Sequence, residues 1–318
     1  MKRGRILAWA AGVVCLGVLI ASLKSSYHLS LLINIGINTI AAVGMSLIFG
    51  QIGQMNMGQA AFFGLGGYTA GALAVKFKLA SIFGVAGALA VPIALAIPIG
   101  WIVLRLSGFY LAMATLAFNA IVVALLSQFE IGPPGVSGIP GIPPMSFGNL
   151  SFEQQNTYAV LVWVVALAAL AFSDNLLRSR VGRALRAIRG SETAAMVTGI
   201  NVTKYKLMIF VFGCALAGLG GALSAHNNSF VGPDSAALGL SIFLLVAVVV
   251  GGKRSIWGAP LGVAALVILV EAVSQYGRYE ILAYGVLLTL ALMYFPNGIA
   301  GLVAQVYGRV ARGTRAGS

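Results

Sequence analysis

The side chains that could perform chemistry are few in this sequence and lie far apart. There are seven acidic residues, and the only one well inside an apolar run is Glu271. His28 and His226 each stand alone, and Cys15 and Cys214 lie within apolar runs without metal-ligand spacing. Neither a G-x-x-x-x-G-K-[ST] phosphate loop nor an H-E-x-x-H zinc motif occurs. We therefore expect no catalytic residue, metal or cofactor, and any energy from ATP must come from another chain.

A second group of residues is polar but uncharged, and it lies where the surrounding sequence is apolar. Asn34 and Asn38 share one helix face at a spacing of four residues. Polar groups inside a membrane are costly, so they form hydrogen bonds between helices or line a path for a solute. Both interpretations stay open for the candidate path residues Gln54, Asn56, Gln59, Thr115 and Asn119. Two further candidates, Gly67 and Gly71, either line the path or only allow close helix packing. A path without fixed charge would suit a zwitterion or a neutral solute.

The basic loop 174–206 contains the pattern of two short helices. Leu185 and Ile188 define one face of a helix from about 181 to 189, and Gly190 is expected to end it in a left-handed conformation. Ser191 is a good N-cap for a second helix, and Glu192 suits the positive end of the helix dipole. Gly199 is expected to end this second helix. The loop either satisfies the positive-inside rule alone or presents a surface that another protein grips.

The composition identifies the environment of these elements. Of 318 residues, 59% are hydrophobic and 8% are charged, against about 25% charged in soluble domains. The mean hydropathy is +0.97. Such a chain cannot cover a water-facing surface, which excludes a cytosolic enzyme or a disordered protein. We predict an all-α, polytopic membrane protein with one transmembrane domain over 1–318.

Ten apolar runs could each form a membrane-spanning helix of about 20 residues. The first is interpreted as an uncleaved span, and the run 57–75, which is crowded with glycine, is expected to be buried among other helices and broken. Two Gly-Leu-Gly-Gly tetrads, at 64–67 and 218–221, would fit two related halves or arise by chance. An eight-span arrangement is the alternative. The runs are 6–23, 29–50, 57–75, 80–104, 109–127, 156–173, 207–225, 237–252, 257–273 and 279–296.

The net charge of +13 indicates how the chain is oriented in the membrane and does not indicate nucleic-acid binding. With ten spans and a cytoplasmic N-terminus, sixteen of the twenty Lys and Arg residues fall on the cytoplasmic side. Both termini and the loop 174–206 are then cytoplasmic. The loop 128–155, rich in Pro and Gly, is external and is expected to be ordered or extended.

Five sequence motifs occur in an order typical of one protein family. They are Glu192, Ala194, Ala195 and Gly199 with Thr193 as an extra residue; Gly50 to Gly64, with Asn56 and Met57 in place of Ser-Leu; Gly108 to Phe118; Gly251-Gly252 to Pro260, with Lys253 and Arg254 as departures; and Pro296-Asn297-Gly298. The stretch 30–302 resembles the inner-membrane permeases of ABC importers, in the branch that handles branched-chain amino acids. It is most similar to the larger, LivM-type subunit.

This resemblance implies the partners and the role of the basic loop. It implies two ABC ATPase subunits that dock on Arg183, Arg186, Glu192, Ala194, Ala195 and Gly199, a second homologous permease, and a periplasmic or extracellular substrate-binding protein. The expected location is the bacterial inner membrane, with a branched-chain amino acid or a similar small polar solute as substrate. The alternatives are an ion-coupled secondary transporter, with Glu271 as the only candidate acid, and a membrane-embedded enzyme.

Overall fold

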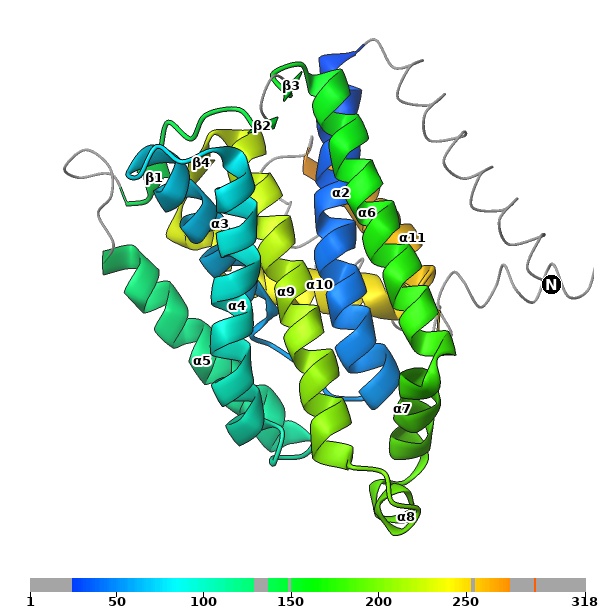
Figure 1. The fold of residues 1–318 in the computed structure, drawn as a ribbon. Coiled ribbons are helices and arrows are strands. Elements are labelled where there is room, and N and C mark those ends of the chain that lie inside the picture. The colour runs from blue at the N-terminus through cyan, green and yellow to red at the C-terminus, as the bar shows by residue number, and fades with distance from the viewer. Residues whose placement is uncertain (1–24, 129–136, 148–149, 253–254, 275–288, 290–318) are drawn as a thin grey trace, which may run out of the picture.

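The computed structural model describes residues 25–128, 137–147, 150–252, 255–274 and 289, and in this part the chain is almost entirely helical (Figure 1). The α-helices are α2 (Ser26–Met45), α3 (Gln59–Val75), α4 (Ser81–Val103), α5 (Phe109–Gln128), α6 (Gln155–Arg178), α7 (Arg180–Gly190), α8 (Glu192–Val197), α9 (Val202–Asn228), α10 (Leu238–Gly251) and α11 (Gly258–Ser274). A π-helix η1 (Ser46–Ile52) extends α2, and a 3-10 helix η2 (Pro233–Ala236) precedes α10. The strands are β1 (Ile139–Pro140), β2 (Ser146–Phe147), β3 (Leu150–Ser151) and β4 (Phe230–Val231).

Five of these helical segments are long and apolar enough to cross a membrane: 26–52, α4, α5, α6 and α9. They coincide with predicted runs and confirm a polytopic helical membrane protein. The helices α3, α10 and α11 fall on three further predicted runs, but they have 17, 14 and 17 residues. The runs 6–23 and 279–296 lie outside the described residues, apart from position 289. The choice between ten and eight spans therefore stays a prediction.

The helix α9 is the central element of the bundle. It packs against α2, α3 and α4, and Figure 1 shows it running the length of the molecule beside α2 and α4. The two repeated tetrads meet here. A Cβ added at Gly66 would lie 2.2 Å from the carbonyl oxygen of Gly218, and one at Gly221 would lie 1.8 Å from that of Phe63. The glycines therefore let the backbones of α3 and α9 touch, as predicted for the crowded run 57–75.

The helical structure is interrupted between η1 and α3. Gly53 has φ +81° and ends the π-helix, and the next helix begins only at Gln59. The run 57–75 was expected to be broken, but from Gln59 onward it is one continuous helix. The break lies just before it, at 53–58. This segment leaves backbone groups among the helices that must find hydrogen-bond partners outside a helix.

The described part of the predicted external loop is ordered. Ile139 pairs with Val231 in an antiparallel ladder of β1 with β4, and β2 pairs with β3. Ile139 and Ile142 are buried, and a Cβ at Gly71 would lie 2.9 Å from Ile142. The loop therefore closes over the end of α3 and holds β4 in place.

Candidate functional site

The basic loop forms a small helical unit at one end of the bundle. The hydroxyl of Ser179 accepts a hydrogen bond from the Val181 N–H at 3.1 Å and caps α7. A Cβ at Gly182 would lie 1.8 Å from the Leu177 carbonyl oxygen, so α7 folds tightly against the end of α6. Arg183 is exposed, and exposed Arg186 donates to the Leu177 carbonyl at 3.0 Å. The tight turn therefore depends on Gly182 and Ser179 as well as on Arg186.

The turn between α7 and α8 differs from the prediction. Gly190 is the last residue of α7 and does not adopt a left-handed conformation. Ser191 instead takes an extended conformation, φ −161°, and accepts a hydrogen bond from the Ala194 N–H at 3.2 Å. One extended serine ends the first helix and caps the second, so no left-handed glycine is needed. The N-cap prediction for Ser191 is confirmed, and the cap prediction for Gly190 is wrong.

The end of α8 is formed as predicted. Gly199 has φ +81°, its N–H donates to the Met196 carbonyl at 3.0 Å, and the Ile200 N–H donates to the Ala195 carbonyl at 3.0 Å. This pair of bonds is the Schellman motif. Ile200 packs with Ile188, Ala195 and Val202, which fastens α8 to α7 and α9. The buried side of α8 is therefore Ala195.

Glu192 has a partner that the sequence analysis did not find. Its carboxylate lies 2.6 Å from the Lys206 Nζ on α9. The Lys206 side chain is 6% exposed, whereas that of Glu192 is 49% exposed. A buried lysine needs a compensating charge, so this ion pair holds the first turn of α8 on α9. Lys206 had been counted only as one of the cytoplasmic basic residues.

The outer side of α8 carries apolar side chains. Met196 is 57% exposed and Val197 is 85% exposed, and Ala194 is also exposed. They lie at the tip of the molecule, below α7 and α9 in Figure 1. Large apolar groups that project from a capped helix are typical of a contact surface.

Three of the candidate path residues stabilise the interrupted start of α3. Asn56 Oδ1 accepts from the Gly58 N–H at 3.0 Å, and Thr115 Oγ1 accepts from the Met57 N–H at 3.0 Å. Gln59 Nε2 donates to the Gly213 carbonyl at 3.0 Å, and Asn56 Nδ2 donates to Gln59 at 2.9 Å. All three side chains are buried. The structure thus brings them together: Asn56 and Thr115 accept from N–H groups at the break that no helix satisfies, and Gln59 ties this cluster to α9.

The other path candidates are buried as well but lie apart from this cluster. Asn119 on α5 donates to the Ala236 carbonyl at 3.1 Å and so fixes η2. Gln54 is 8% exposed. Gly67 and Gly71 face Val231 and Ile142, where side chains would crowd the strand β4 and the loop. A role in the solute path stays a prediction for all seven residues.

We expect Thr115→Val to lower the stability of the protein. The change keeps the volume but leaves the partly buried Met57 N–H without its acceptor. The expected cost is about 1 kcal/mol, the low end of the range for an unsatisfied buried donor. Thr115→Ser keeps the hydroxyl and is the matched control. The measurement is the unfolding temperature in detergent, and equal values for Val and Ser would contradict the capping role. Altered substrate preference at unchanged stability would instead support the path role.

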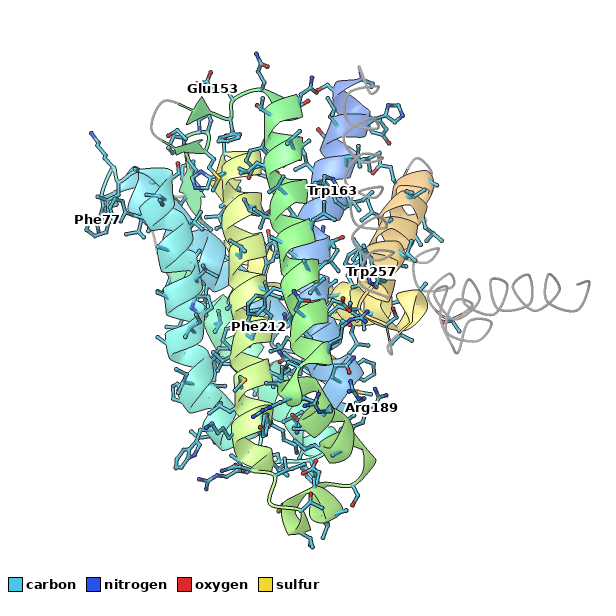
Figure 2. The ribbon with its side chains drawn as sticks, turned by 45° about the vertical axis from the view of Figure 1, so that its right-hand side comes forward. Phe77, Glu153, Trp163, Arg189, Phe212 and Trp257 are labelled. Carbon is cyan, nitrogen blue, oxygen red and sulfur yellow. The ribbon has the colours of Figure 1, made fainter. Side chains whose placement is uncertain are left out.

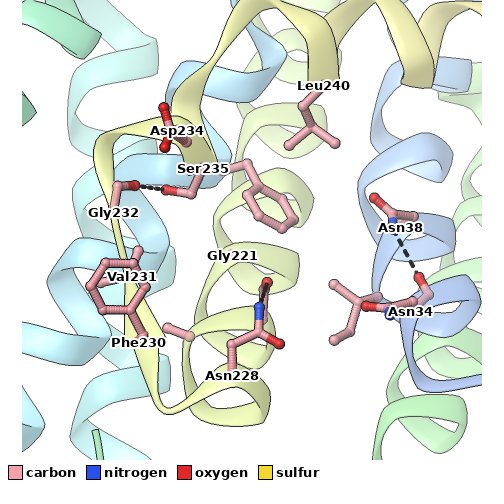
Figure 3. A pocket seen from close by; sticks show the side chains of 14 residues that line it. Asn34, Asn38, Gly221, Asn228, Phe230, Val231, Gly232, Asp234, Ser235 and Leu240 are labelled. Carbon is pink, nitrogen blue, oxygen red and sulfur yellow. Dashed lines mark hydrogen bonds between the residues drawn. The ribbon is translucent and has the colours of Figure 1, made fainter. Parts of the chain in front are cut away.

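A pocket of about 410 Å³ lies near the end of the bundle where α9 ends, between α2, α9 and the segment from β4 to α10. Figure 3 shows Asn34 and Asn38 of α2 on one side and Phe230, Gly232 and Asp234 on the other. Asn34 and Asn38 were noted in the sequence as polar residues, but Asn228 and Asp234 were not recognised. The lining residues are Asn34, Ile37, Asn38, Phe63, Gly221, Ser224, Ala225, Asn228, Phe230, Val231, Gly232, Asp234, Ser235 and Leu240.

The pocket and the basic loop lie at opposite ends of the molecule. In Figure 2, Glu153, beside the strands, is at one end and Arg189 is toward the other. An Arg189 Nη1 donates to the carbonyl of Gly50 in η1, which links the loop to the interrupted helix. The described part of the chain is therefore a bundle of membrane-length helices with a pocket near one end and the short capped helix α8 at the other.

Comparison with known proteins gives the family. Residues 27–296 match the family described as branched-chain amino acid transport system / permease component. The chain belongs to this family, as the motifs predicted, and it is a permease of the ABC importer type. No solved structure matches the chain significantly.

Individual relatives agree with the family match. The high-affinity branched-chain amino acid transport system permease protein LivM of Salmonella typhimurium is 32% identical over 286 residues, covering 82% of this chain and 67% of the relative. LivM of Escherichia coli is 32% identical over 288 residues, with the same coverage. The ribose import permease protein RbsC of Escherichia coli is 27% identical over 268 residues, covering 81% of each chain.

Proposed function

We propose that this chain is the permease subunit through which an ATP-driven importer moves branched-chain amino acids across the bacterial inner membrane. The observation that carries the proposal is the pairing of a capped, outward-facing helix α8 at one end with a solute-sized pocket near the other. The complex would contain two ATPase subunits, a second homologous permease and a substrate-binding protein outside the membrane. Similarity to LivM supports the substrate, whereas similarity to a ribose permease shows that related chains move other solutes.

The surface of α8 fits a groove on an ATPase subunit. Met196 and Val197 supply apolar contacts, and the exposed Arg183 and Arg186 can reach acidic groups around such a groove. Arg189 connects the same unit to Gly50 in η1. Movement of the ATPase subunits would therefore reach α9 through Lys206 and the interrupted helix through Arg189.

The proposed orientation places α8 in the cytoplasm and the pocket toward the outside. We expect a membrane-impermeant thiol reagent to label Glu153→Cys in intact cells and Thr193→Cys only after permeabilisation, because both side chains are exposed at opposite ends. Chains without an added cysteine control for Cys15 and Cys214. The reverse labelling pattern would overturn the orientation.

Purification and uptake together test the function. The tagged chain should co-purify with two ATPase subunits and a second permease, and uptake of labelled leucine should stop when ATP is depleted. Uptake that survives ATP depletion but collapses with the ion gradient would favour an ion-coupled transporter instead. For that alternative, Glu271 is a weak candidate, since the hydroxyl of Tyr27 donates to its carboxylate and links α2 to α11.

A further inference from the structure

The helix α5 packs on the rest of the chain along one narrow stripe. Its buried residues recur every three or four positions and so share one face of the helix: Leu111, Thr115, Asn119, Val122 and Leu126. Large side chains on its other faces are exposed, among them Phe109, Tyr110 and Ile121. The contacts of the buried stripe therefore determine where α5 lies relative to the other described helices.

Two polar residues of this stripe, one helical turn apart, contact two different irregular segments. The Thr115 hydroxyl accepts a hydrogen bond from the Met57 N–H at 3.0 Å, in the break 53–58 before α3. The Asn119 carboxamide donates to the Ala236 carbonyl at 3.1 Å, at the end of η2. Among the described residues, the buried Asn119 Oδ1 has no hydrogen-bond partner. The contact with η2 is therefore the one hydrogen bond that this side chain forms there.

The first irregular segment is connected to the basic loop, and the second forms part of the pocket wall. Arg189 of α7 donates to the Gly50 carbonyl in η1, which leads directly into the break. In η2, Asp234 and Ser235 line the pocket. Both the N–H and the hydroxyl of Ser235 donate to the Gly232 carbonyl, and Figure 3 shows the hydroxyl contact. These bonds make a compact turn, so a shift at the end of η2 would displace this part of the wall.

We propose that α5 couples the basic loop to the pocket, and that Asn119 positions the pocket wall through η2. The proposal rests on the proposed function and adds the route by which the state of the ATPase subunits reaches the pocket. Asn119 is not among the described lining residues, so its effect on a solute is indirect.

The competing route runs through α3, which follows the same break. A Cβ added at Gly64 of α3 would lie 2.5 Å from the Ala236 Cβ, so α3 also touches η2. However, backbone contacts at Gly66 and Gly221 hold α3 against α9, and α3 cannot shift far unless these two helices separate. The contact of α5 with η2 is a side-chain hydrogen bond, which moves without separating α3 from α9.

The test is the reactivity of a cysteine in the pocket wall, measured on the purified complex in lipid nanodiscs with a membrane-impermeant thiol reagent. Asp234→Cys places the thiol on η2, where the side chain is exposed. The reaction rate is measured without nucleotide and with ATP and orthovanadate, which traps the ATPase subunits in one state. We expect the two rates to differ by about fivefold or more, the lower end of typical allosteric coupling. Asn119→Ala should abolish this difference while ATP hydrolysis continues.

Further variants separate coupling from stability. Ser127→Ala is the matched control and should keep the difference, because this α5 hydroxyl donates to the Ala124 carbonyl of its own helix. Thr115→Val should remove the difference, and its combination with Asn119→Ala should behave like either single variant, because both residues act in one route. Asn119→Val, whose side chain is similar in size to asparagine, should behave like Asn119→Ala. Chains without an added cysteine control for Cys15 and Cys214.

Several outcomes would overturn the proposal. They are equal rates in the complex that carries Asp234→Cys alone, a difference that survives in Asn119→Ala or Thr115→Val, and a difference that Ser127→Ala also abolishes. Loss of assembly in both Asn119 variants would overturn it too, since the residue would then hold the fold together. Leucine uptake tests the proposed function separately. A complex that imports leucine and keeps the difference in Asn119→Ala retains that function without this route, whereas a complex that imports none loses both.

Discussion

Gly66→Ala is expected to prevent α3 from packing on α9 and to abolish stable folding. The added methyl carbon would lie 2.2 Å from the carbonyl oxygen of Gly218 and 2.4 Å from its Cα. These are backbone atoms, so the contact is relieved only if the two helices separate. Alanine is the better helix former by about 1 kcal/mol, but overpacking typically costs about 1–3 kcal/mol and more where backbone atoms cannot move aside, as at Gly218. We expect the steric cost to exceed the gain in helix propensity, so the substitution destabilises the protein.

Gly239→Ala is the matched control, because Gly239 also lies in a helix and no atom lies within 4 Å of its added Cβ. The readouts are the amount of monodisperse protein extracted from membranes and its unfolding temperature. We expect Gly239→Ala to match the unchanged protein and Gly66→Ala to give little folded material. Equal yields for both variants would show that the two helices do not make this close contact.

The second large effect is expected from Gly199→Val, which should uncouple ATP hydrolysis from transport. A β-branched residue is strained at φ +81°, and a left-handed conformation costs about 1–2 kcal/mol even for an ordinary residue. The helix α8 has six residues, so it depends on its cap, on the Glu192–Lys206 pair and on the contact of Ile200 with its neighbours. A weakened cap would loosen the surface formed by Met196 and Val197.

The matched variant for this test is Gly199→Asn, since asparagine tolerates the left-handed conformation. No atom lies within 4 Å of a Cβ at this position, so the two variants differ in backbone strain and not in steric crowding at the Cβ. The measurement is ATP hydrolysed per leucine imported in proteoliposomes. We expect the Val variant to import at least about tenfold less per ATP, a change that 1.4 kcal/mol would produce, with normal membrane insertion. If the Asn and Val variants behave alike, the backbone conformation of Gly199 does not control coupling.

The local features of this protein could be predicted from the sequence. The five membrane-length helices follow from unbroken apolar runs, because each helix satisfies its own backbone within lipid. The Ser191 and Gly199 caps of α8 could also be predicted, because a cap involves residues only a few positions apart in the sequence. The family followed from the order of such local motifs.

The tertiary structure decided what depends on residues distant in the chain. Asn56 and Thr115 carry the same polar groups whether they line a path or cap a helix, and only the break at 53–58 shows that they accept from the Gly58 and Met57 N–H groups. Gln59 instead donates to the Gly213 carbonyl on α9, a contact that also depends on the tertiary structure. The ion pair of Lys206 likewise depends on where α8 folds back on α9.

The pocket shows most clearly what could not be predicted from the sequence alone. Asn34 and Asp234 are about two hundred positions apart in the sequence, and no spacing rule connects them. They lie across one pocket because close glycine contacts draw α3 against α9 and because β1 holds β4 beside the end of that helix. Apolar periodicity places helices in a membrane, but contacts between their backbones determine which polar side chains meet.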